Sequence, residues 1–497
     1  MQTLTERFLE TVRRRSDCTA VVDPTLTLTY QQLAAHAAAV AGAVRAIGDR
    51  PFVGIAMPPC AAFPAAYFGI LQAGSIPVPL NVLLEPHILA AIVADSCLET
   101  IITVPPLRSA MAKLVPNVVC PGDIAATPER TWCGTGADAE RTGSGASVTG
   151  STHADDMAML LYTSGTSGPP KGVMLTHRNL LANVDSSVAM VDYSPDDVSL
   201  GVLPLFHTFG VTCTMLLPLL VGASVVYLPK FSPAAAVALI SQHSVTCLFA
   251  VPSVYRLLTQ AAQAVPASPG PSTLRFCVAG GEALGRPVAD GFRSAFGVDL
   301  LEGYGMTEAS PVISMTPPDA PRPGSVGVPL PWAEVKVIDP DGRPLPPDRE
   351  GELLVRGQCV MKGYYQKEDQ TRDTVDPDGW LKTGDIARLD ADGYIYITGR
   401  AKEMIISAGE NISPAEIESV LEQHPSVAEA AVVPMPDAAR GEVPRAIIVL
   451  TPGATASESD LIEHCRERLS RIKRPRKIEF RDELPHTLTG KVLKRKL

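Results

Sequence analysis

The sequence predicts an α/β protein in which helix-covered sheets are followed by a more antiparallel β region and then by a smaller α/β unit. Short apolar, β-branched segments alternate with alanine-rich segments of helical period between residues 31 and 280. Asp-Gly turn signals separate short strands after Pro317, and a second alternation begins at about Ala401. At 497 residues the chain exceeds one compact core, so at least two domains are expected.

The first part of the chain alternates predicted strands with predicted helices. Helices are expected at 31–48 and 63–74. Strands are expected at 51–57, 75–80, 99–104, 157–162, 199–205, 223–228, 246–252 and 274–280. Strands joined through helices form parallel sheets that are covered on both faces.

The rest of the chain differs in composition and in its pattern of turns. Residues 128–155 are rich in Gly, Ser, Thr and Ala and predict a loop or linker. The pairs Asp341-Gly342, Asp378-Gly379 and Asp392-Gly393 are turn signals between short strands, which favours antiparallel pairing. The last unit is expected to contain a helix at 413–423 and strands at 427–434 and 445–450.

Composition excludes several classes of protein. The net charge of −10 argues against a general nucleic-acid binder, which needs excess positive charge. Ten scattered cysteines without metal-like spacing indicate reduced thiols. The uncharged stretches 51–84 and 198–229 are interrupted by prolines, so we expect buried elements and no integral membrane span. A cytoplasmic location is expected, with peripheral membrane association left open.

The most informative stretch is Leu161-Tyr-Thr-Ser-Gly-Thr-Ser-Gly-Pro-Pro-Lys-Gly-Val173. An apolar strand leads into glycines and hydroxyl residues, and Lys171 follows them. Glycines let backbone N–H groups approach phosphate oxygens, hydroxyls donate further hydrogen bonds, and the lysine adds a charge. The alternative is a flexible Gly/Ser linker, but the position directly after a buried strand favours a phosphate loop.

Three further motifs are weaker when taken singly. Glu302-Gly-Tyr-Gly-Met-Thr-Glu308 offers a ring for a planar base, a hydroxyl for phosphate and a carboxylate for Mg²⁺, or else a turn with a core tyrosine. Asp385 and Arg400 suit ribose and phosphate, or form an ordinary ion pair at a surface turn. Leu484-Pro-His-Thr-Leu-Thr-Gly-Lys491 lies in a basic tail that could equally be a solvated face.

Together the four motifs, in this order over residues 161–491, resemble the adenylate-forming superfamily of acyl-CoA synthetases, carrier-dependent adenylation domains and luciferases. The resemblance implies an N-terminal AMP-binding domain at 1–400 and a small mobile C-terminal domain at 401–497. It implies that a carboxylate and ATP react to acyl-AMP and pyrophosphate, with Mg²⁺ bound, and that the acyl group then passes to a thiol.

The resemblance also implies roles for individual residues. Thr307 would contact the α-phosphate, Glu308 would hold Mg²⁺, and Lys491 would reach both the substrate carboxylate and the α-phosphate. Lys402 falls at the hinge between the domains, and Ala408 and Gly409 fall in the tunnel for the incoming thiol. The expected ATP- and AMP-binding residues are Thr163, Ser164, Gly165, Thr166, Ser167, Gly168, Lys171, Gly281, Glu282, Ala283, Tyr304, Asp385 and Arg400.

The segment Pro204-Leu-Phe-His-Thr-Phe-Gly210 matches the border of the acyl pocket, where His207 would lie near the carboxylate or gate the tunnel. A buried core histidine is the alternative. The apolar run that follows resembles fatty-acid ligases, and a flexible alkyl chain gains about 0.8 kcal/mol per buried CH₂. We therefore expect a medium- or long-chain fatty acid as substrate, with an aryl acid as an alternative.

The acceptor thiol is expected to belong to CoA. The basic segment 471–477 would suit the phosphates of CoA or the acidic surface of an acyl carrier protein. A carrier-protein ligase or a stand-alone adenylation enzyme is thus the nearest alternative. A catalytically silent binding protein would have no need for Lys491, Glu308, Asp385 and Arg400 together, and an unrelated kinase-like ATPase would release ADP.

Overall fold

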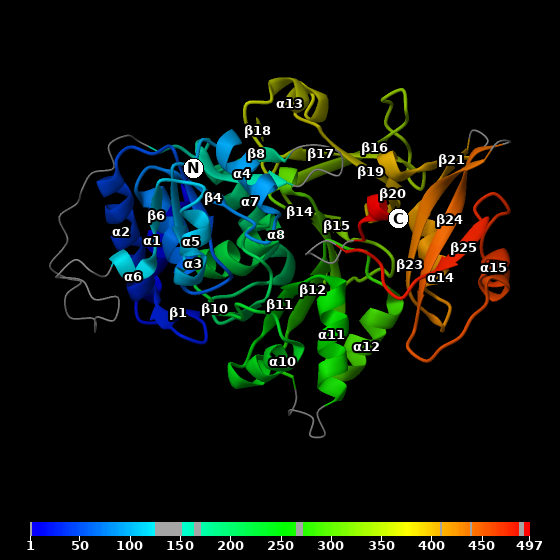
Figure 1. Ribbon diagram of the computed structural model, residues 1–497, viewed down its shortest axis with the longest axis horizontal. Helices are drawn as coiled ribbons and strands as arrows, with labels where there is room; N and C mark the ends of the chain where they lie inside the picture. Colours follow the sequence, from blue (N-terminus) through cyan, green and yellow to red (C-terminus); the bar gives the residue numbers. More distant parts are fainter. Residues whose placement is uncertain are drawn as a thin grey trace.

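The computed structural model describes residues 2–124, 152–163, 170–264, 272–407, 410–437, 440–486 and 492–497. Its described residues form five sheets covered by helices, which confirms the predicted α/β class (Figure 1). Most of the predicted linker at 128–155 lies outside the described residues.

The largest sheet has the strand order β15-β14-β13-β12-β11-β9-β10-β1-β2. The strands from β13 to β1 pair in parallel, and β2, β14 and β15 add antiparallel edges. The strands are β1 (Thr19–Val22), β2 (Thr27–Thr29), β9 (Val198–Gly201), β10 (Ser224–Tyr227), β11 (Cys247–Ala250), β12 (Phe276–Gly280), β13 (Leu300–Gly305), β14 (Val312–Met315) and β15 (Val328–Pro329).

Both faces of this sheet are buried, as the apolar strands predict. Along β11, Cys247 and Phe249 enter one core, whereas Leu248 and Ala250 enter another, because successive side chains of a strand point to opposite faces. One face is covered by α10 (Pro233–Gln242), α11 (Pro252–Gln263) and α12 (Arg286–Phe296). The other is covered by α1 (Leu4–Arg15), α2 (Tyr30–Ile47), α3 (Ala62–Gln72), α7 (His177–Val191), α8 (Thr208–Val211), a π-helical turn (Thr212–Leu216) and α9 (Leu217–Val221).

Two predicted strands are shorter in the structure, and a proline follows the end of each. The strand expected at 199–205 ends at Gly201, and Pro204, which has no N–H for a ladder, lies in the turn before α8. The strand expected at 246–252 ends at Ala250, because Pro252 starts α11 at a position that suits its fixed φ.

Two smaller sheets lie beside the first. A parallel sheet contains β3 (Phe52–Ala56), β4 (Ile76–Pro79), β5 (Thr100–Thr103) and β6 (Asn117–Val119). Its connections include α4 (Pro86–Asp95), a 3₁₀ turn (Pro105–Leu107) and α5 (Arg108–Met111), and α6 (Pro121–Ile124) follows its last strand. An antiparallel sheet joins β7 (Met157–Thr163), β8 (Lys171–Thr176) and β18 (Gly363–Tyr364).

The predicted antiparallel region is confirmed. Its sheet contains β16 (Ala333–Ile338), β17 (Gly351–Gly357), β19 (Leu381–Leu389) and β20 (Ile395–Arg400), with α13 (Glu368–Thr374) between β18 and β19. Gly342, Gly379 and Gly393 have φ values of +82°, +82° and +84°, so each Asp-Gly pair forms a turn that favours glycine.

The chain ends in a unit with its own core, which we call the C-terminal unit (residues 405–497; Figure 1, orange to red). Its elements are β21 (Ile405–Ser407), β22 (Glu410–Ile412), α14 (Pro414–Leu421), β23 (Val427–Asp437), β24 (Gly441–Leu450), α15 (Glu458–Arg466), β25 (Lys477–Phe480) and a 3₁₀ turn (Lys494–Lys496). A 3₁₀ turn at Ala401–Glu403 precedes it. No helix in the described part of the chain is long and apolar enough to cross a membrane.

Candidate active site

Several predicted site residues gather at one edge of the largest sheet. Strands β9, β11, β12 and β13 run parallel, so their carboxyl ends share that edge. The chain reaches His207 after β9, Gly281–Ala283 after β12, and Tyr304–Glu308 at the end of β13. Open α/β sheets bind ligands outside the carboxyl ends of their strands, so the fold brings together motifs that lie about 100 residues apart in the sequence.

The acyl-side segment is fixed to the nucleotide-side segment by hydroxyl groups. The Thr208 hydroxyl donates to Thr307 Oγ1 at 3.0 Å, and the Thr212 hydroxyl donates to the Ser310 carbonyl at 3.1 Å. Gly210 allows the tight turn before α8, because a β-carbon there would lie 2.1 Å from the Pro204 carbonyl oxygen. The structure therefore places His207, in the same turn, next to the segment that carries Thr307.

Tyr304, Asp385 and Arg400 form one connected group. Asp385 and Arg400 are register partners on β19 and β20. Arg400 Nε donates to Asp385 Oδ1 at 2.8 Å, and the Tyr304 hydroxyl donates to Oδ2 at 2.5 Å. The Asp385 side chain is 4% exposed, whereas that of Arg400 is 43% exposed. The two side chains do form an ion pair. Because they lie on paired strands and the carboxylate is buried, the alternative of a surface turn is wrong.

Burial sets the protonation state of Tyr304. Desolvation, together with the neighbouring Asp385 carboxylate, raises the pKa of the Tyr304 hydroxyl far above its ordinary value. The phenol therefore stays neutral and donates to Asp385. This bond fixes the ring at the end of β13, where Tyr304 packs against two clusters of buried apolar side chains that include Ile313 and Leu353.

Glu308 is held by a residue that the sequence motifs did not identify. The Tyr364 hydroxyl donates to Glu308 Oε1 at 2.8 Å, and Lys171 Nζ lies 4.7 Å from the centre of the Tyr364 ring. Lys171 is also the register partner of Thr163 across β7 and β8. The two ends of the predicted phosphate loop therefore lie side by side, close to the predicted metal ligand.

The donor set fits a magnesium ion that arrives with a nucleotide. Mg²⁺ is usually held by one or two carboxylates together with substrate phosphates and water. Glu308 supplies one carboxylate from the 3₁₀ turn (Thr307–Ala309) that follows β13. Within the described ranges no group of three or more His, Cys, Asp or Glu side chains could hold a metal, so these residues do not form a cage of their own.

Comparisons with known proteins agree with this geometry. The model of the AMP-binding enzyme family matches residues 8–365, and that of the AMP-binding enzyme C-terminal domain matches residues 416–491. The chain belongs to this family. A feruloyl-CoA synthase of Amycolatopsis sp. is 36% identical over 97% of this chain and 96% of its own length. A long-chain-fatty-acid–CoA ligase of Escherichia coli O157:H7 is 33% identical over 100% of this chain and 94% of its own length.

Solved structures of AMP-binding enzymes also match along the full chain. ATP-bound MatB of Rhodopseudomonas palustris superposes with a TM-score of 0.89 at 30% identity, covering 100% of this chain and 98% of that one. The o-succinylbenzoate CoA synthetase of Bacillus subtilis with ATP and magnesium superposes with a TM-score of 0.85 at 29% identity, covering 99% of this chain and 98% of that one. The predicted enzyme class, an AMP-forming acid–thiol ligase, and the predicted use of ATP, Mg²⁺ and CoA are confirmed.

Several predicted site residues of this AMP-binding enzyme lie outside the described residues. These are Ser164, Gly165, Thr166, Ser167, Gly168, Ala408, Gly409 and Lys491. Lys402 is described and lies exposed in the 3₁₀ turn before the C-terminal unit. His486 and Val492 form a β-bridge on either side of 487–491, and the Leu493 N–H donates to the Pro485 carbonyl at 2.6 Å.

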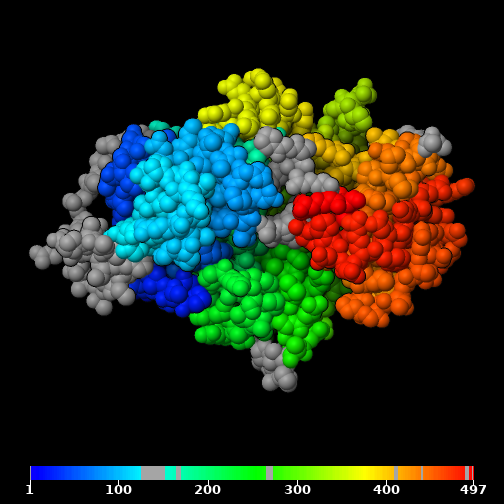
Figure 2. Space-filling view, in the orientation of Figure 1, coloured from blue at the N-terminus to red at the C-terminus, as the bar shows by residue number. Residues whose placement is uncertain are grey.

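Charged contacts that no motif predicted tie the C-terminal unit together and to the rest of the chain. Arg256 of α11 lies 3.3 Å from Glu429 of β23, and the other Glu429 oxygen lies 3.3 Å from His486. Lys494 lies 2.8 Å from Glu418 and 3.3 Å from Glu403. Figure 2 shows the last residues, in red, on the side of the C-terminal unit that faces the rest of the molecule. Apart from His486, which lies in the Leu484–Lys491 motif, nothing in the sequence marks these residues, since a lone arginine or glutamate has no pattern.

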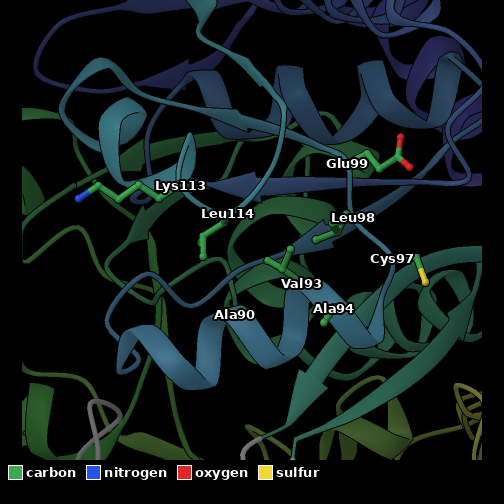
Figure 3. A pocket seen from close by; sticks show the side chains of 8 residues that line it. All are labelled: Ala90, Val93, Ala94, Cys97, Leu98, Glu99, Lys113 and Leu114. Atoms are coloured by element: carbon green, nitrogen blue, oxygen red, sulfur yellow. The ribbon is translucent and has the colours of Figure 1, made fainter.

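One surface depression lies away from this site. It is lined by the end of α4 and the chain before β5, with Glu99 and Lys113 on opposite sides of the view (Figure 3). None of the predicted site residues lines it. It therefore plays no part in the candidate active site.

Proposed function

We propose that this AMP-binding enzyme activates an apolar carboxylic acid, a medium- or long-chain fatty acid, and transfers it to CoA. The observation that carries the proposal is the segment from Phe206 to Leu228, which contains no charged residue. The Thr208–Thr307 bond fixes its start beside the nucleotide motif, and its later part is buried. Such surroundings favour an alkyl group and disfavour a second carboxylate.

The residues take the following proposed roles. Lys171 and the loop from Thr163 would bind the β- and γ-phosphates, and Tyr304 with Gly281, Glu282 and Ala283 would enclose adenine. Asp385 and Arg400 would bind ribose, which fits one buried acceptor and one half-exposed donor on adjacent strands. Thr307 would contact the α-phosphate, and His207 would lie at the carboxylate.

The chemistry has two steps. A carboxylate oxygen of the acid bonds to the α-phosphorus while the bond from phosphorus to pyrophosphate breaks. The CoA sulfur then bonds to the acyl carbon and loses its proton, and AMP leaves. Two unit charges at about 4 Å in a medium of effective dielectric about 20 repel by roughly 4 kcal/mol, so Lys491 would offset the approach of the two anions. Mg²⁺ held by Glu308 would offset charge on the phosphates.

The two steps would use different faces of a mobile C-terminal domain. We place the domains at 1–400 and 401–497, with Lys402 at the hinge, as the sequence predicts. The separate core of the C-terminal unit supports this division, since a unit with its own core can move as a body. Lys491 would serve adenylation, and Ala408 and Gly409 would line the path of the thiol.

An aryl acid is the second candidate, and one observation favours it. A β-carbon on Gly280 would lie 3.3 Å from Phe209 Cζ, so the Phe209 ring lies directly against the end of β12. A flat ring at this place can stack on a flat substrate. The 36% identity to a feruloyl-CoA synthase points the same way.

The test is acid-dependent exchange between ATP and pyrophosphate over a panel of fatty, cinnamic and short acids, followed by addition of CoA or an acyl carrier protein. We expect exchange with fatty acids, and AMP and acyl-CoA as products. Activity confined to aromatic acids would show that the substrate is an aryl acid, the second candidate. Transfer to carrier protein and not to CoA would show that the acceptor is a carrier protein.

A further inference from the structure

We propose that Tyr364 is a positioning residue that sets the Glu308 carboxylate for the metal and the Lys171 ammonium for the phosphates. The inference deepens the proposed function and rests on the roles given there to Glu308 and Lys171. Tyr364 lies on β18, outside the motifs that suggested the site, and touches both of these residues.

The hydroxyl of Tyr364 fixes one side of the carboxylate. It donates to Glu308 Oε1 at 2.8 Å, while the N–H of Met361 donates to the Glu308 backbone carbonyl at 2.8 Å. The segment 361–364 therefore holds Glu308 at both its backbone and its side chain. With Oε1 engaged by a neutral donor, the plane of the carboxylate is set and Oε2 remains for a cation.

The ring of Tyr364 supports the lysine. Lys171 Nζ lies 4.7 Å from the ring centre, within the range of a cation–π contact. Lys171 and Tyr364 come from strands that pair directly, since Tyr364 is the register partner of Val173. The ring thus holds the lysine by a contact that leaves all three ammonium protons available to phosphate oxygens.

The backbone around Tyr364 is itself fixed. The Thr371 hydroxyl oxygen accepts from the Tyr364 N–H at 2.9 Å, and Gly363 has a φ of +145°, which favours glycine. A β-carbon on Gly363 would also lie 2.8 Å from the Thr371 side chain. Tyr364 is 6% exposed, so its ring has little freedom to leave this position.

A tyrosine that merely filled the core would need its ring and not its hydroxyl. The variant Tyr364→Phe separates these cases, because it keeps the ring below Lys171 and removes only the donor to Glu308. Tyr365→Phe is the matched control: the neighbouring ring packs edge-on against Phe52 at 5.2 Å. Tyr364→Leu additionally removes the platform of Lys171.

The experiment measures ATP binding by calorimetry at a series of Mg²⁺ concentrations, alongside ATP–pyrophosphate exchange and thermal unfolding. For Tyr364→Phe we expect the Mg²⁺ concentration at half-saturation to rise about tenfold, with unchanged melting temperature and unchanged ATP binding without Mg²⁺. Tyr364→Leu should also weaken ATP binding without Mg²⁺. Tyr365→Phe should match the parent protein.

A double variant tests whether Tyr364 acts through the Glu308 carboxylate. In a Glu308→Gln background, adding Tyr364→Phe should change Mg²⁺ dependence no further, since the donor then has no carboxylate to orient. Unchanged Mg²⁺ dependence in Tyr364→Phe alone would overturn the proposal. Because binding is measured directly, absence of exchange with every acid would count against the proposed function and leave the Tyr364 result interpretable.

Discussion

The nucleotide side of the largest sheet and the C-terminal unit are built in different ways. At the sheet edge, predicted functional side chains are held by neighbours: Asp385 by Tyr304 and Arg400, and Glu308 by Tyr364. The C-terminal unit has a core of its own, and Arg256–Glu429 is an ion pair that crosses to it from α11. In the first region the predicted site residues hold one another in place, whereas the second has its own core and is joined to α11 by a partly exposed ion pair.

This difference matches the two demands of a two-step ligase. A reacting α-phosphorus needs groups fixed in place, because electrostatic stabilisation depends on preorganisation. A change from one half-reaction to the next needs a body that can leave its first position without losing its own fold. Variants in the two regions should therefore fail differently.

The largest effect is expected from Lys491→Ala in the C-terminal unit. Removing the charge that offsets the two anions should slow adenylate formation by about 100- to 1000-fold. Thioester formation from supplied acyl-adenylate should be largely spared. The measurements are ATP–pyrophosphate exchange and single-turnover transfer to CoA, with Lys496→Ala, an exposed lysine of the last 3₁₀ turn, as the control. Equal loss of both half-reactions would refute a lysine that serves only one of them.

The next effect is expected from Asp385→Ala at the sheet edge. The change removes the acceptor of both Tyr304 and Arg400, so KM for ATP should rise about 10- to 100-fold. Exposed Asp378, on the turn before β19, gives the control variant Asp378→Ala. In contrast to Lys491→Ala, both half-reactions should suffer, because AMP stays bound during the second. An unchanged KM for ATP in Asp385→Ala would remove Asp385 from the nucleotide site.

The sequence predicted more of the first region than of the second. Strand ends, Asp-Gly turns and the 302–308 motif all have local signals, and their positions in one sheet follow from parallel pairing. The contacts of Tyr364 and Arg256 have no local signal in the sequence, because each depends on a partner more than 50 residues away. The two shortened strands show the limit on boundaries: each apolar run continues beyond the last paired residue of its strand.

A pH-dependent effect on stability is expected from Glu302→Gln on β13. Burial raises the pKa of the Glu302 carboxyl from 4.5 to about 7. The folded protein therefore holds this proton up to about pH 7, while the unfolded chain releases it near 4.5. The stability it contributes is complete below about pH 4.5 and is lost as the pH rises through 7.

Glutamine has no such proton to lose. The difference in unfolding free energy between Glu302→Gln and the parent should thus shift in favour of the variant by about 2 kcal/mol between pH 5.5 and pH 8. Urea unfolding at the two pH values measures it, with exposed Glu350→Gln as the control. A difference that does not vary with pH would show that Glu302 is ionised in the folded protein.

The smallest effect, and the one that bears most directly on the comparison, is expected at Arg256 and Glu429. Their side chains are 41% and 25% exposed, so the pair is worth only about 0.5 kcal/mol. Arg256→Glu or Glu429→Arg should lower ATP–pyrophosphate exchange about two- to threefold. The swapped double variant should recover part of it, since the contact of position 429 with His486 stays lost.

The direction of this effect tells which half-reaction the observed docking serves. Glu429 also contacts His486, which precedes the segment with Lys491, so the pair should favour adenylation. Transfer from supplied acyl-adenylate should then be unchanged or slightly faster in the single variants, and the difference should fade at high salt. If transfer slows and exchange does not, this position of the C-terminal unit belongs to the second step. A swap that recovers nothing would mean that α11 and β23 are held together by packing alone.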